Sequence, residues 1–275
     1  RDSSTSRGLG DVYKRQALQH LLAIFVAIIT PPLIIASALK LDVEKTSFLV
    51  SMSLFASGVS TFIQCRRIGP IGAKLLCIQG TSFSFIGPII ATGLVGGLPL
   101  IFGSCIAAAP IEMVVSRTFK YLRNIITPLV SGIVVLLIGL SLIKVGIVSC
   151  GGGYGAMDDG SFGSWENLSI AALVLLSVLF FNRCKNKYLR MSSIVFGLCL
   201  GYGLAFALGK VNMSALNVEM LMSFNIPQPF KYGIDFNISS FIAIGLVYLI
   251  TAIEATGDVT ANSMISGLPI EGDSY

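Results

Sequence analysis

The sequence predicts an all-α polytopic membrane protein, and three observations lead to that fold class. Of the 275 residues, 54% are hydrophobic and 12% are charged, whereas soluble domains carry about 45–50% and about 25%. The mean hydropathy is +0.82, so a water-soluble fold could not cover its surface with polar side chains. The apolar residues also gather in runs of about 20, the length that crosses the core of a lipid bilayer. A secreted disulfide scaffold, a disordered chain and a nucleic-acid-binding domain are thereby excluded.

Eight membrane spans are expected, each bounded by charged residues, Pro or Gly. They cover residues 17–39, 46–64, 75–95, 98–116, 125–148, 167–182, 191–209 and 238–258. The polar residues 1–16 precede the first span and lack the apolar segment and cleavage site of a signal peptide. Their end, DVYKRQ, resembles translated adapter sequence. We therefore predict a non-native leader, with an ordinary cytoplasmic tail as the alternative.

The charges in the loops predict how the spans are oriented. Loops on one side hold ten basic and no acidic residues, and loops on the other hold five basic and seven acidic ones. Because Lys and Arg are retained on the cytoplasmic side, the chain is expected to start in the cytoplasm. The cytoplasmic set is Arg66, Arg67, Lys74, Arg117, Lys120, Arg123, Arg183, Lys185, Lys187 and Arg190. The other set is Lys40, Lys45, Lys144, Lys210, Lys231, Asp42, Glu44, Asp158, Asp159, Glu166, Glu219 and Asp235.

Four ionisable residues fall within the expected spans: His20, Glu112, Glu254 and Asp258. A charge in mid-membrane is costly, so each is a functional candidate. Glu254 and Asp258 stand four apart, which places both carboxylates on one face of a helix. Two acids that close cannot both ionise cheaply, so the pair could bind and release a proton near neutral pH. Alternatively, Asp258 lies at the water interface, His20 is a structural hydrogen-bond donor, and Glu112 either relays protons or satisfies a neighbouring helix.

The third span has an unusual sequence. Gln79–Phe85 (QGTSFSF) interrupts the apolar run, and Gly87-Pro88 follows it. Gly, hydroxyls and Pro in mid-membrane predict broken or extended backbone, which lipid tolerates only where it lines a cavity. Discontinuous spans of this kind mark the binding sites of transporters. Freed backbone groups would suit a flat ligand, and Phe83 or Phe85 could stack on it. A kinked helix packed through small residues is the alternative.

Three motifs, in this order along the chain, resemble the nucleobase–ascorbate transporter family, also called the nucleobase:cation symporter-2 family. They are Ala17–His20 (ALQH), Gln79–Phe85, and Glu254–Ala261 (EATGDVTA). Two further stretches support the resemblance, one from Pro128 to Gly146 and the other at Pro227–Gly233. The similarity runs from about residue 17 to the end of the chain.

The resemblance implies fourteen spans in two inverted repeats of seven, of which this chain carries the first eight, with a short extended strand in the broken third span. Residues 17–116 (spans 1–4) and 238–275 (span 8) would belong to a core domain, 122–209 (spans 5–7) to a gate domain, and 210–237 to an external loop. Spans 9–14 are then expected to lie outside this chain, which is read as a truncated fragment that does not transport alone.

The family pattern also implies roles for single residues. Glu254 would bind the ring N–H groups of a nucleobase, and Phe83 would stack on the base. Ser82 would bind at the same site and pair with His20. Asp258 matches a position that holds Asp in xanthine-type members and His in uracil-type members, which favours the xanthine branch, with uric acid second. Ser82 departs from the Asn of some xanthine permeases, so purine selectivity stays open.

We therefore expect proton-coupled uptake of xanthine or uric acid by a multi-pass protein of the cell membrane, which the resemblance implies is a homodimer. The alternatives are a uracil or other nucleobase permease, or an anion exchanger of the same fold. Acids in the eighth span disfavour an anion site, and a single His without an HExxH partner disfavours a membrane hydrolase. Six scattered cysteines predict neither a disulfide framework nor a zinc site. No enzyme activity, and no cofactor besides the proton, is expected.

Overall fold

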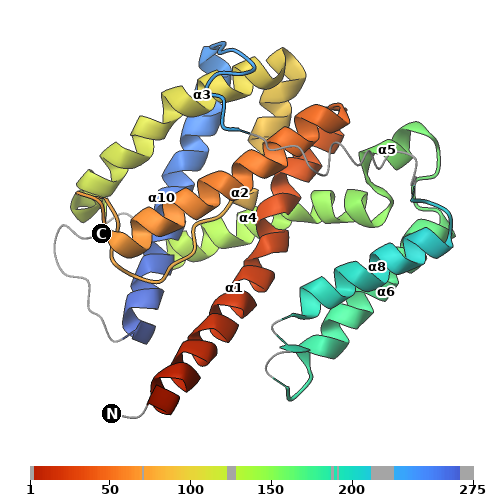
Figure 1. Ribbon diagram of the computed structural model, residues 1–275. Helices are drawn as coiled ribbons and strands as arrows, with labels where there is room; N and C mark the ends of the chain where they lie inside the picture. The colour runs from red at the N-terminus through yellow and green to blue at the C-terminus, as the bar shows by residue number, and fades with distance from the viewer. Residues whose placement is uncertain are drawn as a thin grey trace. The chain divides into compact units, whose positions relative to one another are not determined.

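The computed structural model describes residues 3–69, 71–122, 128–186, 189–190, 192–211 and 226–266. These residues form helices joined by loops, without a β-strand (Figure 1). Arg123, Lys187 and Glu219, which belong to the predicted loop charges, lie outside this part of the chain. The helices are α1 (Ser3–Ala38), α2 (Val43–Arg66), η1 (Phe83–Phe85, a 3-10 turn), α3 (Ile86–Leu122), α4 (Pro128–Cys150), α5 (Gly153–Asp158), α6 (Trp165–Asn182), α8 (Ser193–Ala207) and α10 (Ile238–Ser266).

Every expected span overlaps a helix. Four helical stretches within the described residues are long and apolar enough to cross a membrane: Val43–Arg66, Phe83–Thr118, Trp165–Asn182 and Ile238–Val259. Two shorter apolar helices, Ile24–Ala38 and Ser193–Ala207, match the first and seventh expected spans. The prediction of an all-helical membrane protein is confirmed. The backbone of α1 is already helical from Ser3. That residues 1–16 are a non-native leader stays a prediction.

Helix α3 contains the end of the expected third span and the whole of the fourth. Gly96 (φ −141°, ψ 16°) and Gly97 (φ 66°, ψ −161°) break its helical geometry, and the helix bends sharply there (Figure 1). Gly97 has a positive φ, which a residue with a side chain rarely adopts. The break falls between residues 95 and 98, where one expected span ends and the next begins.

The chain divides into two compact units, which we describe separately. One unit consists of Arg1–Thr30 and Gly146–Phe224, and the other of Pro31–Val145 and Asn225–Tyr275. These boundaries differ from those of the predicted core and gate domains, because the first span and the fifth are each divided between the two units. The core and gate domains therefore stay a prediction.

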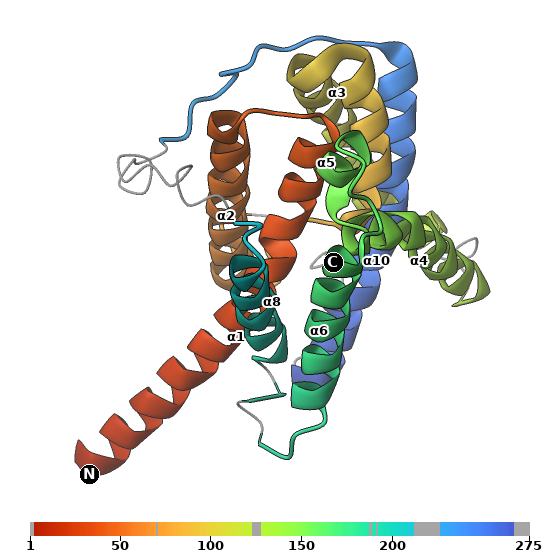
Figure 2. The same cartoon turned by 90° about the vertical axis from the view of Figure 1, so that its right-hand side faces the viewer.

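In the second unit, α10 packs along α3 (Figure 2). On α10, Ile244, Val247 and Thr251 form a buried stripe at the spacing of one helix face. On α3, Ser104 and Ala108 are fully buried. Small residues at this interface let the two backbones approach closely, as in membrane helix pairs.

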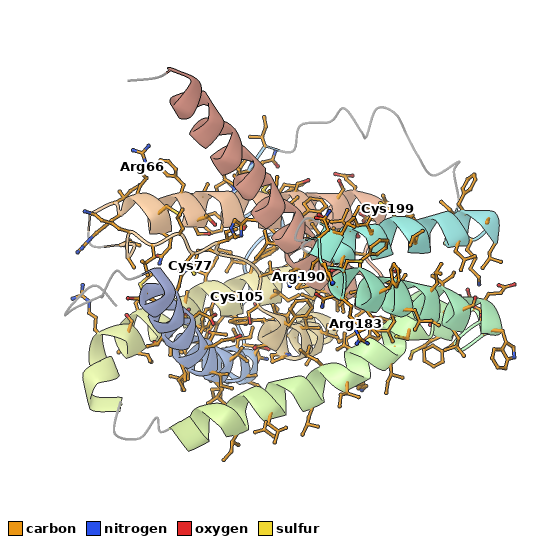
Figure 3. The ribbon with its side chains drawn as sticks, turned by 90° about the horizontal axis from the view of Figure 1, so that it is seen from below. Arg66, Cys77, Cys105, Arg183, Arg190 and Cys199 are labelled. Carbon is orange, nitrogen blue, oxygen red and sulfur yellow. The ribbon has the colours of Figure 1, made fainter. Side chains whose placement is uncertain are left out.

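In the first unit, α6 and α8 form an antiparallel pair through a glycine face. A Cβ on Gly197 would lie 2.6 Å from Val178 Cγ2, and one on Gly201 would lie 2.5 Å from Val174 Cγ2. The two glycines are four residues apart, the spacing of the membrane Gly-x-x-x-Gly contact. Side chains on other faces of α6, such as Leu176 at 64% and Phe180 at 68%, are exposed as a lipid-facing surface would be. Arg183 and Arg190 lie at the end where the two helices are joined (Figure 3).

This glycine contact leads to a stability prediction. The substitution Gly201→Val should force α6 and α8 apart and lower the free energy of unfolding by about 1–3 kcal/mol, because the packed interface has no room for a side chain. Thermal unfolding in detergent measures the effect. The control is Gly203→Val on the same helix, since a Cβ there would have nothing within 4 Å. Equal loss of stability in both variants would contradict the packing.

Candidate functional site

The predicted break in the third span is confirmed. Between the end of α2 and the start of η1, residues 72–82 form no helix. Ser82 has extended geometry (φ −90°, ψ 133°), and its side chain caps η1 by accepting a hydrogen bond from the Ser84 N–H at 3.3 Å. The only β-pairing among the described residues is the isolated bridge between Ile68 and Ile71. The break in the helix is therefore present, with extended geometry at Ser82, whereas the short strand expected there stays a prediction.

Two hydroxyls of α2 hold this extended stretch at Gln79. The Ser57 hydroxyl donates a hydrogen bond to the Gln79 carbonyl, and the Gln79 backbone N–H donates to Thr61 Oγ1 at 2.9 Å. Ser57 and Thr61 are four residues apart, so they lie on the same face of α2. Both polar groups of one peptide position outside the helices are thus satisfied, as a non-aqueous environment requires.

Helix α10 runs beside the same stretch in the opposite direction. In its first half, the rings of Tyr248 and Phe85 meet edge to face with centroids 4.9 Å apart. Near its end, Asn262 Nδ2 donates a hydrogen bond to the Leu76 carbonyl at 3.0 Å. These two contacts bracket residues 76–85 on one side and residues 248–262 on the other. The broken third span and the acidic eighth span are therefore neighbours.

Glu254 and Asp258 lie between those two contacts. Glu254 follows Tyr248 by six residues, about 9 Å along the helix axis, which brings it level with the polar part of the extended stretch. Both acids lie on continuous helix, one turn apart, as the sequence predicts. The described residues leave both side chains exposed.

The remaining predicted residues fall on other elements. Phe83 begins η1 and is half-buried. His20 lies on the part of α1 that belongs to the first unit, and its side chain is exposed. The structure does not place it relative to Ser82, so their pairing stays a prediction. Glu112 is half-buried on α3.

A cavity of about 670 Å³ opens in the second unit beside the broken span. Ser82 borders it, whereas Phe83, Glu254 and Asp258 are not among its lining residues. Cys105, labelled in Figure 3, also faces it from α3. The size and the mostly apolar wall with a few polar groups are typical of small-molecule sites. Its wall consists of Pro31, Pro32, Ile35, Phe48, Leu49, Met52, Ser53, Thr81, Ser82, Phe85, Ile89, Leu98, Ile101, Phe102, Cys105, Ile106, Pro227, Gln228, Pro229, Phe230, Lys231, Tyr232 and Tyr248.

The sequence analysis missed the residues that assemble this region. Ser57 and Thr61 could have been noticed as two hydroxyls four residues apart in an otherwise apolar span. Tyr248 and Asn262 flank the acidic motif that was recognised, but their partners lie about 160 to 190 residues away in the sequence. Their contacts depend on the tertiary structure and have no local signal.

The hydroxyl pair on α2 can be tested by substitution. Ser57→Ala or Thr61→Val should each lower the free energy of unfolding by about 1–3 kcal/mol, because a half-buried backbone group at Gln79 loses its partner. Thermal unfolding in detergent is the measurement. Ser60→Ala is the control, since the Ser60 hydroxyl donates only within its own helix, to the Ala56 and Ser57 carbonyls. If Ser60→Ala lowered the free energy of unfolding as much as Ser57→Ala, the hydrogen bonds to Gln79 would not be the cause of the effect.

The sequence of this chain matches a family of known proteins. The sequence model of the Permease family (Xan_ur_permease) matches residues 15–275. The chain is 46% identical to the xanthine permease XanQ of Escherichia coli K12 over 268 residues, and 46% identical to the xanthine permease XanP of the same strain over 270 residues. It is 34% identical to the uric acid permease PucJ of Bacillus subtilis 168 over 257 residues. The three alignments cover 92–94% of this chain but only 57–58% of each relative.

Proposed function

Because the chain belongs to this permease family, the nucleobase–ascorbate transporters, we propose that the protein carries a purine nucleobase, xanthine or uric acid, across the cell membrane. The family match spans nearly the whole chain, and relatives named as xanthine and uric acid permeases support the choice of substrate. One structural observation carries the proposal. The acidic motif of α10 lies beside a third span whose backbone is not helical over residues 72–82.

We propose that Glu254 accepts hydrogen bonds from the ring N–H groups of the purine. A carboxylate accepts hydrogen bonds and so complements adjacent ring donors. Phe83, on η1 next to the extended stretch, would stack on the planar ring. Ser82 would hydrogen-bond to the edge of the purine from the wall of the cavity, and His20 would pair with Ser82.

The coupling ion in this proposal is a proton. Glu254 and Asp258 are one helical turn apart, and two negative charges at that spacing repel each other. Binding of one proton to the pair removes the repulsion and reduces the cost of moving these groups through the membrane. Protonation and purine binding together would therefore favour the transport step.

The orientation and the assembly are also proposals. The basic loops, including the one that joins α6 to α8, support a cytoplasmic N-terminus. A homodimer rests on the family resemblance alone. The site would lie within each protomer, since the broken span and α10 come from one chain.

The substitution Glu254→Gln tests the central role. In the full-length gene product, it should reduce xanthine uptake by about 100-fold, because a charge-assisted hydrogen bond to the purine is lost. Uptake into cells, normalised to the amount of folded protein in the membrane, is the measurement. Glu166→Gln is the control, since Glu166 pairs with Lys210 on an exposed surface. Normal uptake by Glu254→Gln would refute the proposal.

Proton coupling has a separate test. Equilibrium binding of radiolabelled xanthine to the purified full-length gene product should change with pH, because in this proposal the acid pair takes up a proton together with the purine. The Glu254→Gln variant has no proton to exchange at this position. Its remaining xanthine binding should therefore depend much less on pH. A pH profile of the same shape in both proteins would place the coupling group elsewhere.

A further inference from the structure

One wall of the cavity is formed by six consecutive residues, Pro227–Tyr232. The loop that carries them is fixed against α3. The Asp235 backbone N–H donates to the Pro99 carbonyl at 3.0 Å, and a Cβ on Gly103 would lie only 1.8 Å from the Asp235 carbonyl oxygen. Within the segment, the Lys231 N–H donates to the Gln228 carbonyl at 3.3 Å. These contacts fix the backbone of the loop against α3.

Lys231 brings a cation to this wall. Its Nζ lies 4.4 Å from the centroid of the Phe48 ring and 5.5 Å from that of Tyr232, distances at which an ammonium is attracted to an aromatic face. Its acidic neighbour, Glu44, is 3.6 Å away, which is too long for a hydrogen bond. The Glu44 side chain is 79% exposed, whereas that of Lys231 is 28% exposed. Among the described residues, the ammonium donates no hydrogen bond, so its three donors can serve a ligand.

Tyr232, whose ring centroid lies 5.5 Å from the Lys231 ammonium, carries a second donor. Its hydroxyl oxygen is buried and has no hydrogen-bond partner among the described residues. Its ring is held by two others, edge to face with Phe48 at 5.5 Å and stacked with Phe102 at 6.2 Å. Burial of an unpaired hydroxyl costs free energy, which a ligand acceptor would recover. The rings of Phe48 and Phe102 also border the cavity.

We propose that Lys231 and Tyr232 form a second subsite, for the anionic form of an oxopurine, in the cavity that Ser82 also borders. The ammonium and the phenol would donate to an oxo group that carries part of the negative charge, and the aromatic side chains would contact the planar ring. The acids on α10 repel an anion, so a charged purine needs a cation elsewhere in its path. Among the described residues that line the cavity, Lys231 alone is a Lys or Arg. The inference rests on the proposed function and extends it to substrate charge.

The test compares urate, an anion at neutral pH, with the less charged xanthine. In cells that express the full-length gene product, Lys231→Met should raise the KM for urate uptake by about tenfold, because a hydrogen bond to a charged group is lost. The KM for xanthine should change much less, and the maximal rate should be unchanged. Lys231→Arg should restore most of the urate affinity. Tyr232→Phe keeps the ring and removes the hydroxyl, and it should raise the urate KM by about fivefold.

Glu44→Gln separates a ligand site from a structural ion pair. If Lys231 only fastens the loop to Glu44, then Glu44→Gln and Lys231→Met should impair uptake of both purines equally, which would overturn the subsite. If Lys231 binds urate, Glu44→Gln should leave the urate KM unchanged or lower it. The proposed subsite would also be overturned if neither Tyr232→Phe nor Lys231→Met changed the urate KM. Failure of the wild-type protein to take up either purine would instead count against the proposed function.

Discussion

The arrangement of the second unit depends on hydrogen-bond partners for the backbone of a non-helical segment, residues 72–82, in an apolar environment. Backbone N–H and C=O groups outside a helix need partners there, because lipid offers none. Ser57 and Thr61 provide them for Gln79, and Asn262 provides one for Leu76. With these groups satisfied, the chain can stay out of helix from residue 72 to 82, and Thr81 and Ser82 at its end line the cavity. Without them, a continuous helix would be the cheaper structure for this span.

The same contacts connect the two parts of the proposed site. The extended stretch lies between α2 and α10, so the element that fixes its backbone and the element that carries the acids are both in contact with it. Small residues at the α3–α10 interface bring the helices close enough for this. The loop before α10 contributes Pro227–Tyr232 to the wall of the cavity, and α3 contributes residues on both sides of its bend, such as Ile89 and Leu98.

Much of the fold was predictable from hydropathy, because spans in a membrane carry a strong local signal in length and composition. The break at Gln79–Phe85 was predictable too, since Gly and hydroxyls in mid-span are rare without a cause. The partners of that break were not, because a hydrogen bond between Asn262 and Leu76 joins residues 186 apart in sequence. Nor did the pattern show that Phe83 lies outside the lining of the cavity while Phe85 is part of it. Periodicity cannot fix the direction of a ring in a 3-10 turn.

The central claim is that the acids of α10 and the extended third span form one purine site. The most direct measurement is an experimental structure of the full-length gene product with bound xanthine. The account predicts that the Glu254 carboxylate lies within hydrogen-bond distance of the ring N–H groups, with the ring of Phe83 stacked on the purine. A purine bound elsewhere, with Glu254 directed at lipid, would contradict it.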